Sequence, residues 1–216
     1  MEDFMRVVKD SVRVKVPIGA CRFFASVAPI KSEDDAKSFI EAVSIEFRDA
    51  THNAWGYKLG GSMDVARYSD DREPSGTAGP PILQAIESAE VSNVVVVVTR
   101  FYGGVKLGVG GLIRAYRQTA SEGLAAAGSV EVPILREILI SGLGYNVLGT
   151  VLHELESCKA TVKAVEHGPT VAVRADIFPR TIDSIRARVT DLTRGQGEVY
   201  LDRKSTRLNS SHGIIS

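Results

Sequence analysis

The stretch from Val94 to Arg117 constrains the fold more than any other part of the sequence. It opens with five consecutive valines and Thr99, an apolar, β-branched run of strand length. Such a run is typical of a strand that is covered on both faces. A glycine-rich segment follows, and a helix is then predicted from about Gly111 to Ala127, ending at Gly128. We therefore expect one domain to close near residue 130.

Strands and helices alternate ahead of this stretch. Val12–Val16 alternates apolar and polar residues, as a half-buried strand does. Ser32 to Asp35 resembles a capping box, and it precedes apolar residues at helical spacing. The remaining predicted elements are strands at Arg22–Val27 and Ala54–Leu59, a turn-rich segment over 69–81 that is too polar for the core, and a short helix opened by Pro80 and Pro81.

The residues after 130 show a different order of elements. Strands are predicted at 134–141, 160–166, 170–177 and 197–201. One helix is expected to be capped by Asn146, and a second to be opened by Pro179. The order β-α-β-β-α-β is that of the ferredoxin-like fold. We therefore predict an α+β protein with domains at 1–130 and 131–201.

The last residues, 202–216, do not resemble the end of a domain. From Asp202 to His212 they match one reading frame of a common sequencing adapter. We interpret 202–216 as an assembly artefact and expect it to be disordered. A genuine polar tail is the alternative.

Composition narrows the class of protein. Lys and Arg number 26 and Asp and Glu number 26, so the net charge is zero and any RNA contact requires a local basic cluster. No apolar run approaches the roughly 20 residues that cross a bilayer, and no signal peptide is visible. We expect a cytoplasmic protein without a membrane partner. Cys21 and Cys158 are predicted to be buried thiols, because no second ligand or partner lies nearby.

The glycine-rich segment is one candidate site. Its glycines allow close approach of another group, and the helix that follows offers unpaired amide groups to an anion. A phosphate or RNA site is predicted at Arg100, Gly103, Gly104, Lys106, Gly108, Gly110, Gly111, Arg114 and Arg117. The spacing matches neither a Walker loop nor a dinucleotide fingerprint. The alternative is structural, with glycines that allow tight strand-to-helix packing and arginines that pair with Asp70, Asp71 or Glu73.

The second candidate site combines acidic and hydroxyl residues. It comprises His52, Asp70, Asp71, Glu73, Ser75 and Thr77. Three carboxylates could hold a divalent cation or transfer protons. A rigid turn in which Asp side chains accept backbone hydrogen bonds is the competing interpretation. No catalytic residue is assigned.

Three segments together resemble the signatures of the IMPACT family, in its two-domain YigZ-like branch. They are Asp49–Tyr57, Asp70–Gly79 and Arg100–Tyr116, within a resemblance that extends over about 12–201. The resemblance implies an N-terminal domain of the ribosomal-protein type with a left-handed β-α-β crossover. It also implies a C-terminal ferredoxin-like domain similar to the last domain of elongation factor G. Arg72 stands where the family usually has glycine, so a positive φ there would strain the backbone.

The same resemblance favours translation-linked RNA or ribosome binding without a cofactor. Eukaryotic relatives share only the N-terminal domain and regulate translation under stress by competing for a kinase activator. One alternative is an enzyme that acts on a phosphorylated or nucleotide substrate, with Mg²⁺ at the acidic residues. Another is a protein-interaction module. No DNA specificity is predicted.

Overall fold

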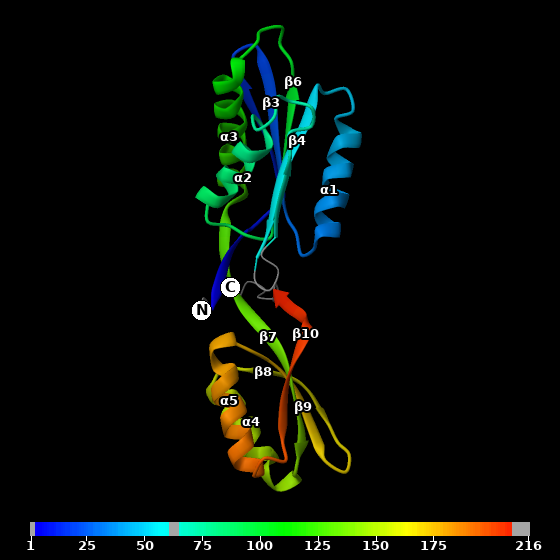
Figure 1. The fold of residues 1–216 in the computed structure, drawn as a ribbon, viewed down its shortest axis with the longest axis vertical. Coiled ribbons are helices and arrows are strands. Elements are labelled where there is room, and N and C mark those ends of the chain that lie inside the picture. Colours follow the sequence, from blue (N-terminus) through cyan, green and yellow to red (C-terminus); the bar gives the residue numbers. More distant parts are fainter. Residues whose placement is uncertain (1–2, 61–64, 209–216) are drawn as a thin grey trace, which may run out of the picture. The chain divides into compact units, whose positions relative to one another are not determined.

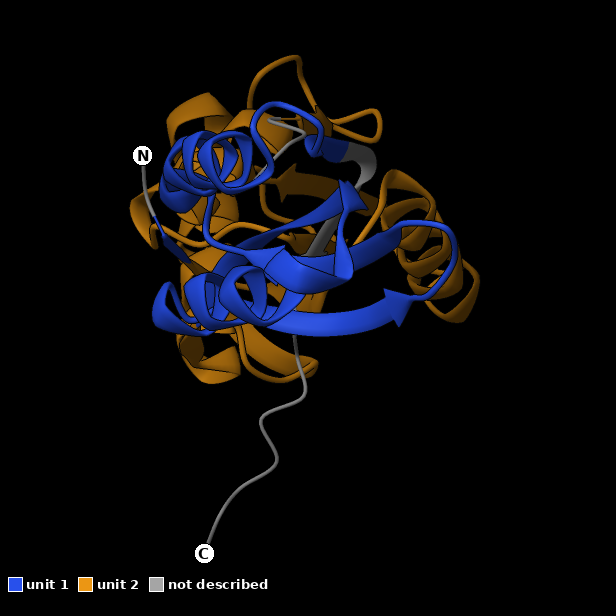
Figure 2. Cartoon of the chain, turned by 90° about the horizontal axis from the view of Figure 1, so that it is seen from below, with its two compact units in different colours: residues 1–4, 132–216 blue, residues 5–131 orange. Residues whose placement is uncertain are grey.

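The computed structural model describes residues 3–60 and 65–208. The chain divides into two compact units, shown in different colours in Figure 2. The N-terminal unit comprises Met5–Glu131, and the C-terminal unit comprises Met1–Phe4 with Val132–Ser216. The chain passes between them one residue from the boundary expected at 130. β1 (Phe4–Val8) and β7 (Ser129–Leu143) both cross that boundary along the chain.

A five-stranded sheet forms the centre of the N-terminal unit. Its order is β2-β3-β6-β4-β5, and every neighbouring pair is antiparallel. β3 and β4 are therefore parallel to each other on either side of β6, and α1 is the crossover between them. The elements are β2 (Val12–Ile18), β3 (Cys21–Pro29), α1 (Glu33–Glu46), β4 (His52–Leu59), β5 (Val65–Ser69), α2 (Gly79–Ser88), β6 (Val94–Phe101) and α3 (Gly108–Ala127).

The valine run is the central strand of this sheet, covered on both faces as predicted. Val94, Val96 and Val98 pack in one cluster with residues of α2 and α3. Val95 and Val97 pack in a second cluster with residues of α1. Figure 1 shows α1 on one side of the sheet and α2 and α3 on the other. Because side chains alternate along a strand, an all-apolar run requires such cover on both faces.

Local signals place the helices of this unit. Ser32 accepts a hydrogen bond from the backbone N–H of Asp35, which confirms the predicted cap of α1. α3 ends at Gly128, where φ is +63°. The sequence analysis did not identify β1 or β5, both of which are only five residues long.

The C-terminal unit has the predicted β-α-β-β-α-β order. Its sheet runs β1-β7-β9-β8, with β10 paired to β7, and its core lies between the sheet and the two helices. The elements after β7 are α4 (Tyr145–Ser157), β8 (Thr161–Glu166), β9 (Val171–Ile177), a 3₁₀ turn (Pro179–Thr181), α5 (Ile182–Thr193) and β10 (Glu198–Leu208). The α+β fold class is confirmed, with two sheets and five α-helices in the described residues.

Three expectations for this unit need correction. The N-cap of α4 is Gly144 rather than Asn146, whose side chain folds back toward Gly144 from the first turn. Residues 1–4 belong here, because the backbone N–H of Ile134 donates to the Asp3 carbonyl and Arg180 pairs with Asp3. Backbone pairing of β10 with β7 continues to Leu208, whereas disorder was expected from Asp202. Such pairing uses backbone groups that every sequence carries.

The remainder of the expected artefact, 209–216, lies outside the described residues. The register of β10 shifts between Leu201 and Thr206, close to where the adapter-like sequence begins. No helix in the described part of the chain has both the length and the apolar character needed to cross a bilayer.

Candidate functional site

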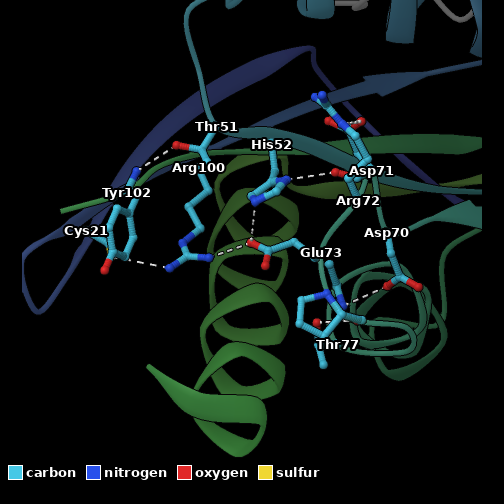
Figure 3. A network of polar contacts seen from close by, with 12 residues as sticks. Cys21, Thr51, His52, Asp70, Asp71, Arg72, Glu73, Thr77, Arg100 and Tyr102 are labelled. Carbon is cyan, nitrogen blue, oxygen red and sulfur yellow. Dashed lines mark hydrogen bonds and ion pairs between the residues drawn. The ribbon is translucent and has the colours of Figure 1, made fainter. Parts of the chain in front are cut away.

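The three signature segments meet around one buried carboxylate. His52 begins β4, Glu73 lies in the turn between β5 and α2, Arg100 is near the end of β6, and Tyr116 is in α3. We call these four residues the buried network; Figure 3 shows all of them except Tyr116 with labels. Sheet register brings His52 opposite Arg100. The segments are up to 64 residues apart in sequence, so only the folded sheet unites them.

Glu73 is the centre of the buried network. Its carboxylate is 3% exposed, and its Oε1 accepts from Arg100 Nη1 at 2.6 Å and from the Tyr116 hydroxyl at 2.7 Å. Burial, together with the charge of Glu73 and the hydrogen bond to it, raises the pKa of Tyr116, so the hydroxyl stays protonated as a donor. The prediction that the turn over 69–81 is too polar for the core is therefore wrong at Glu73. A paired carboxylate can be buried where an unpaired one cannot.

Arg100 belongs to this interior rather than to the surface of the glycine-rich segment. Its side chain is 7% exposed and lies between two aromatic rings, 5.8 Å from the Phe23 centroid and 5.6 Å from that of Tyr102. Nη2 also donates to Cys21 Sγ at 3.8 Å. Burial disfavours the charged guanidinium, but the hydrogen bonds to Glu73 and Cys21 outweigh it and raise the pKa of Arg100. Arg100 is thus placed to hold the signatures together, not to reach a ligand outside.

His52 connects the network to the turn. Its Nδ1 lies 2.8 Å from the carbonyl oxygen of Asp71, so this nitrogen carries the proton and donates. The other nitrogen, Nε2, faces Glu73 Oε1 at 3.7 Å. Figure 3 shows the ring between the two contacts. The imidazole is 17% exposed and is held by the fold on both sides.

The acidic segment forms a tight, self-bonded turn, which we call the acidic turn (70–79). The N–H of Glu73 donates to the Asp70 carbonyl, and φ is positive at both Asp71 (+41°) and Arg72 (+68°). Arg72 thus has the positive φ at which a residue other than glycine is strained. These angles are those of a type I′ turn, in which glycine is favoured at the position of Arg72. Arg72 itself is exposed and pairs with Asp71 at 3.5 Å.

The aspartates of the acidic turn bind backbone groups. Asp70 accepts from the N–H groups of Gly76, Ala78 and Gly79, at the beginning of α2. Burial acts to raise the pKa of Asp70, but these three hydrogen bonds prevail and lower it. Asp71 accepts from the N–H of Asn53 at 2.6 Å.

The two hydroxyl residues of the predicted acidic site differ in exposure. Thr77 is buried and donates to the Pro74 carbonyl, whereas Ser75 is exposed.

The three carboxylates therefore point to three separate sets of donors. Asp70 binds the start of α2, Asp71 binds β4, and Glu73 binds Arg100 and Tyr116. The described residues contain no group of three or more His, Cys, Asp and Glu side chains placed to hold a metal ion. The arrangement supports the competing interpretation of the aspartates, in which they build a rigid turn.

The segment between β6 and α3, which we call the glycine loop (102–107), is exposed. Gly103 passes so close to the β2–β3 turn that a Cβ would lie 1.9 Å from the Ala20 carbonyl oxygen. Gly104 and Gly108 have positive φ, +85° and +71°. Tyr102 is 46% exposed, Val105 is 58% exposed, and Val109 just beyond the loop is 61% exposed. The loop thus presents aromatic and apolar side chains to the outside.

The N-terminus of α3 concentrates positive charge. Leu107 occupies the N-cap without a side-chain hydrogen bond, and the first turn contains no acidic residue. Arg114 Nη1 lies 3.5 Å from the position of a Cβ on Gly110, so its charge lies over this first turn. Lys106 and Arg114 form no ion pair with any residue in 3–60 or 65–208. Arg117 instead reaches Ser88 of α2, at 3.4 Å.

The predicted phosphate site is thus divided by the structure. Lys106, Arg114 and the backbone of 103–111 lie at one exposed end, whereas Arg100 is buried with Glu73 and Arg117 points to α2. The sequence analysis did not assign Tyr116, Cys21 or Tyr102 to either site, although it expected Cys21 to be buried, as it is. The four-residue spacing from Leu112 to Tyr116 assigns Tyr116 to the core, but nothing local shows that its hydroxyl meets an acid.

Comparisons with known proteins cover both units. The family described as the Impact N-terminal domain matches residues 20–124. The IMPACT family member YvyE of Bacillus subtilis is 32% identical over 192 residues, which is 89% of this chain and 88% of that protein. The IMPACT family member YigZ of Escherichia coli is 30% identical over 85% of this chain and 91% of that protein.

A solved structure shows the same arrangement of elements. The crystal structure of a hypothetical protein, 26% identical, has a TM-score of 0.67 and covers 95% of this chain and 100% of that one. Matches of this length include the three signatures and both units. The chain belongs to the IMPACT family.

Proposed function

We propose that this chain is a translation-linked protein that binds RNA or the ribosome through the glycine loop and the N-terminus of α3. The link to translation comes from the family, whose eukaryotic members are expected to regulate translation under stress. The mode of contact comes from the exposed end of the N-terminal unit. Lys106, Arg114 and the amide groups of the first turn of α3 bind phosphate groups of the nucleic acid backbone.

The electrostatics at the start of α3 carry this proposal. A helix N-terminus bears a partial positive charge and favours acidic side chains, by about 0.3–1 kcal/mol each. Here the N-cap makes no side-chain bond, the first turn has no acid, and Arg114 lies over it. Positive charge therefore gathers at the start of α3, with no acidic residue in the first turn to offset it. A phosphate would accept from the free N–H groups and pair with both cations at once.

The buried network has a supporting role in this proposal. It joins the acidic turn, the end of β6 and α3, which are the elements on either side of the glycine loop. Gly103 fastens the loop to the β2–β3 turn. A loop anchored at both ends loses little conformational entropy on binding.

Co-sedimentation of the full chain with ribosomal subunits and with total RNA tests the proposal. Two or three phosphate contacts predict that affinity for single-stranded RNA falls about ten-fold between roughly 50 mM and 200 mM salt. Arg114→Glu and Lys106→Glu should each weaken binding at both salt concentrations. Lys15→Glu is the matched control, because Lys15 is an exposed cation on β2 of the same unit.

The outcomes separate three functions. Loss with Arg114→Glu but not with Lys15→Glu supports the phosphate site. Equal binding by all variants removes the glycine loop from the function. Absence of co-sedimentation at either salt concentration directs attention to nucleotide binding with Mg²⁺, and capture of a protein partner that survives nuclease treatment directs it to an interaction module. The exposed Val105 and Val109 are the side chains that such a partner would contact.

A further inference from the structure

We infer that Tyr102 is a stacking platform for an unpaired base, so the partner class at the glycine loop is single-stranded RNA rather than a duplex. The inference rests on the proposed function and adds what phosphate contacts do not determine, which is whether the bound nucleic acid is single-stranded. Phosphate contacts alone do not distinguish a duplex from a single strand. An exposed aromatic ring does, because bases stack on side chains only where they are unpaired.

The ring of Tyr102 is held in place on its inner side. Its backbone N–H donates to Thr51 Oγ1 at 3.0 Å, and the Arg100 guanidinium lies 5.6 Å from the ring centroid. Figure 3 shows the ring beside the Arg100 side chain. Arg100 is itself fixed by the 2.6 Å ion pair with Glu73. The ring is therefore supported through the buried network instead of moving freely with the loop.

The outer side of the same ring is open. Tyr102 is 46% exposed, although its neighbours Arg100 and Phe23 are buried. Among the described residues, only Arg100 makes a ring contact with Tyr102. A cation behind an aromatic ring leaves its other face available for stacking. Tyr102 is also four residues from Lys106, which is within the reach of adjacent nucleotides along a backbone.

The charge around the ring matches a nucleic acid better than an apolar partner. Lys106 and Arg114 have no acidic partner in the described ranges, and the first turn of α3 adds its own positive end. A protein or lipid partner would use Val105 and Val109 without needing Tyr102 to be backed by a guanidinium. The combination of a stacking ring with flanking cations is the arrangement by which proteins hold single-stranded nucleic acids. Glu73 and Arg100 are positioning residues in this account.

The test compares ligands that differ only in what Tyr102 can contact. They are a single-stranded RNA oligonucleotide, a duplex RNA of the same length, and inorganic polyphosphate, which has charge without bases. Tyr102→Leu should weaken binding of the single strand by about ten-fold and leave duplex and polyphosphate binding unchanged. Tyr102→Phe should bind within about two-fold of the parent, because stacking requires the ring and not the hydroxyl.

Two further variants keep the test decisive. Tyr102→Trp enlarges the ring and should bind the single strand more tightly than the parent, an increase that damage to the fold cannot produce. Tyr145→Leu is the matched control, since Tyr145 is a 58% exposed tyrosine of the C-terminal unit. A fluorescent purine within the oligonucleotide should be quenched by the parent and by Tyr102→Phe but not by Tyr102→Leu.

Failure of this inference differs from failure of the proposed function. If Arg114→Glu weakens RNA binding while Tyr102→Leu does not, the stacking platform is refuted and the phosphate site stands. A preference for duplex RNA, or equal effects of Tyr102→Leu on all three ligands, also refutes it. If neither RNA form binds, both the platform and the phosphate site fall.

Discussion

Breaking the buried ion pair should destabilise the N-terminal unit more than any surface substitution. Glu73→Leu leaves the Arg100 guanidinium, 7% exposed, without its anion and the Tyr116 hydroxyl without its acceptor. Removal of one partner of a buried pair costs about 3–5 kcal/mol. A domain has only about 5–15 kcal/mol of stability in total. We therefore expect Glu73→Leu to lower the midpoint of unfolding by roughly 10–20 °C.

The double variant Glu73→Leu/Arg100→Leu tests the reason for that loss. Apolar residues in place of both partners remove the uncompensated charge, and such replacements are often neutral. Most of the lost stability should therefore return, with about 1–3 kcal/mol still missing for the unpaired Tyr116 hydroxyl. Adding Tyr116→Phe should recover part of that remainder. A positive coupling energy between positions 73 and 100 is the expected signature.

Trp55 provides the assay, because it is the single tryptophan of the chain and lies on β4 of the same unit. Thermal unfolding followed by its fluorescence reports this unit. Glu46→Leu is the control, since Glu46 pairs with Arg13 on the surface and its loss should leave the midpoint nearly unchanged. If Glu73→Leu is as mild as Glu46→Leu, or if the double variant is no more stable than Glu73→Leu, the reasoning is refuted.

Three further predictions concern the turns around the site. Arg72→Gly should stabilise the unit by about 0.5 kcal/mol, because relief of the left-handed backbone strain exceeds the added conformational entropy of the unfolded chain. Arg72→Ala should give no such gain, and equal melting temperatures for the two variants would contradict this. Gly103→Ala should displace the glycine loop, because the added Cβ would collide with the Ala20 carbonyl. Amide hydrogen exchange at 102–107 should increase, and unchanged protection would contradict the close approach. Because the pKa of Asp70 is lowered, its contribution to stability is complete above the ordinary Asp pKa of 3.8 and is lost as the pH falls below it. Asp70→Asn should therefore reduce the loss of stability at acid pH, measured by urea midpoints from about pH 6 to pH 2. An unchanged loss would assign it to other groups.

Several elements were predictable because their signals are local. The Ser32 cap and the Gly128 stop depend on hydrogen bonds and dihedral angles within a few residues. The valine run required cover on both faces whatever the topology. In contrast, β5 is too short for a pattern to emerge, and β10 continues into a segment that was interpreted as an artefact and expected to be disordered.

The residues of the candidate site also differ in how far the sequence predicted them. The exposure of Lys106 and Arg114 at the start of α3 was implied by a glycine-rich segment that opens a helix. The burial of Arg100 was not predicted, although pairing of the arginines with Asp70, Asp71 or Glu73 was the structural alternative, and the pair with Glu73 is the one that forms. Its partner Glu73 is 27 residues away in sequence. The free energy of burying Arg100 depends on this pairing, which no pattern of neighbouring residues determines.

The sequence by itself determined the fold class, the family and most elements of each unit, although not β1 or β5. Hydrophobic periodicity, caps and turn residues act over a few positions, so they can be read along the chain. Only the tertiary structure decided which signature residues meet. Antiparallel register brings His52 opposite Arg100, and packing of α3 on the sheet brings Tyr116 to Glu73. The same packing turned Arg100 inward, because the buried Glu73 carboxylate needs a cation beside it. It left Tyr102, Lys106 and Arg114 outside, where the first turn of α3 has no acidic residue to pair with them.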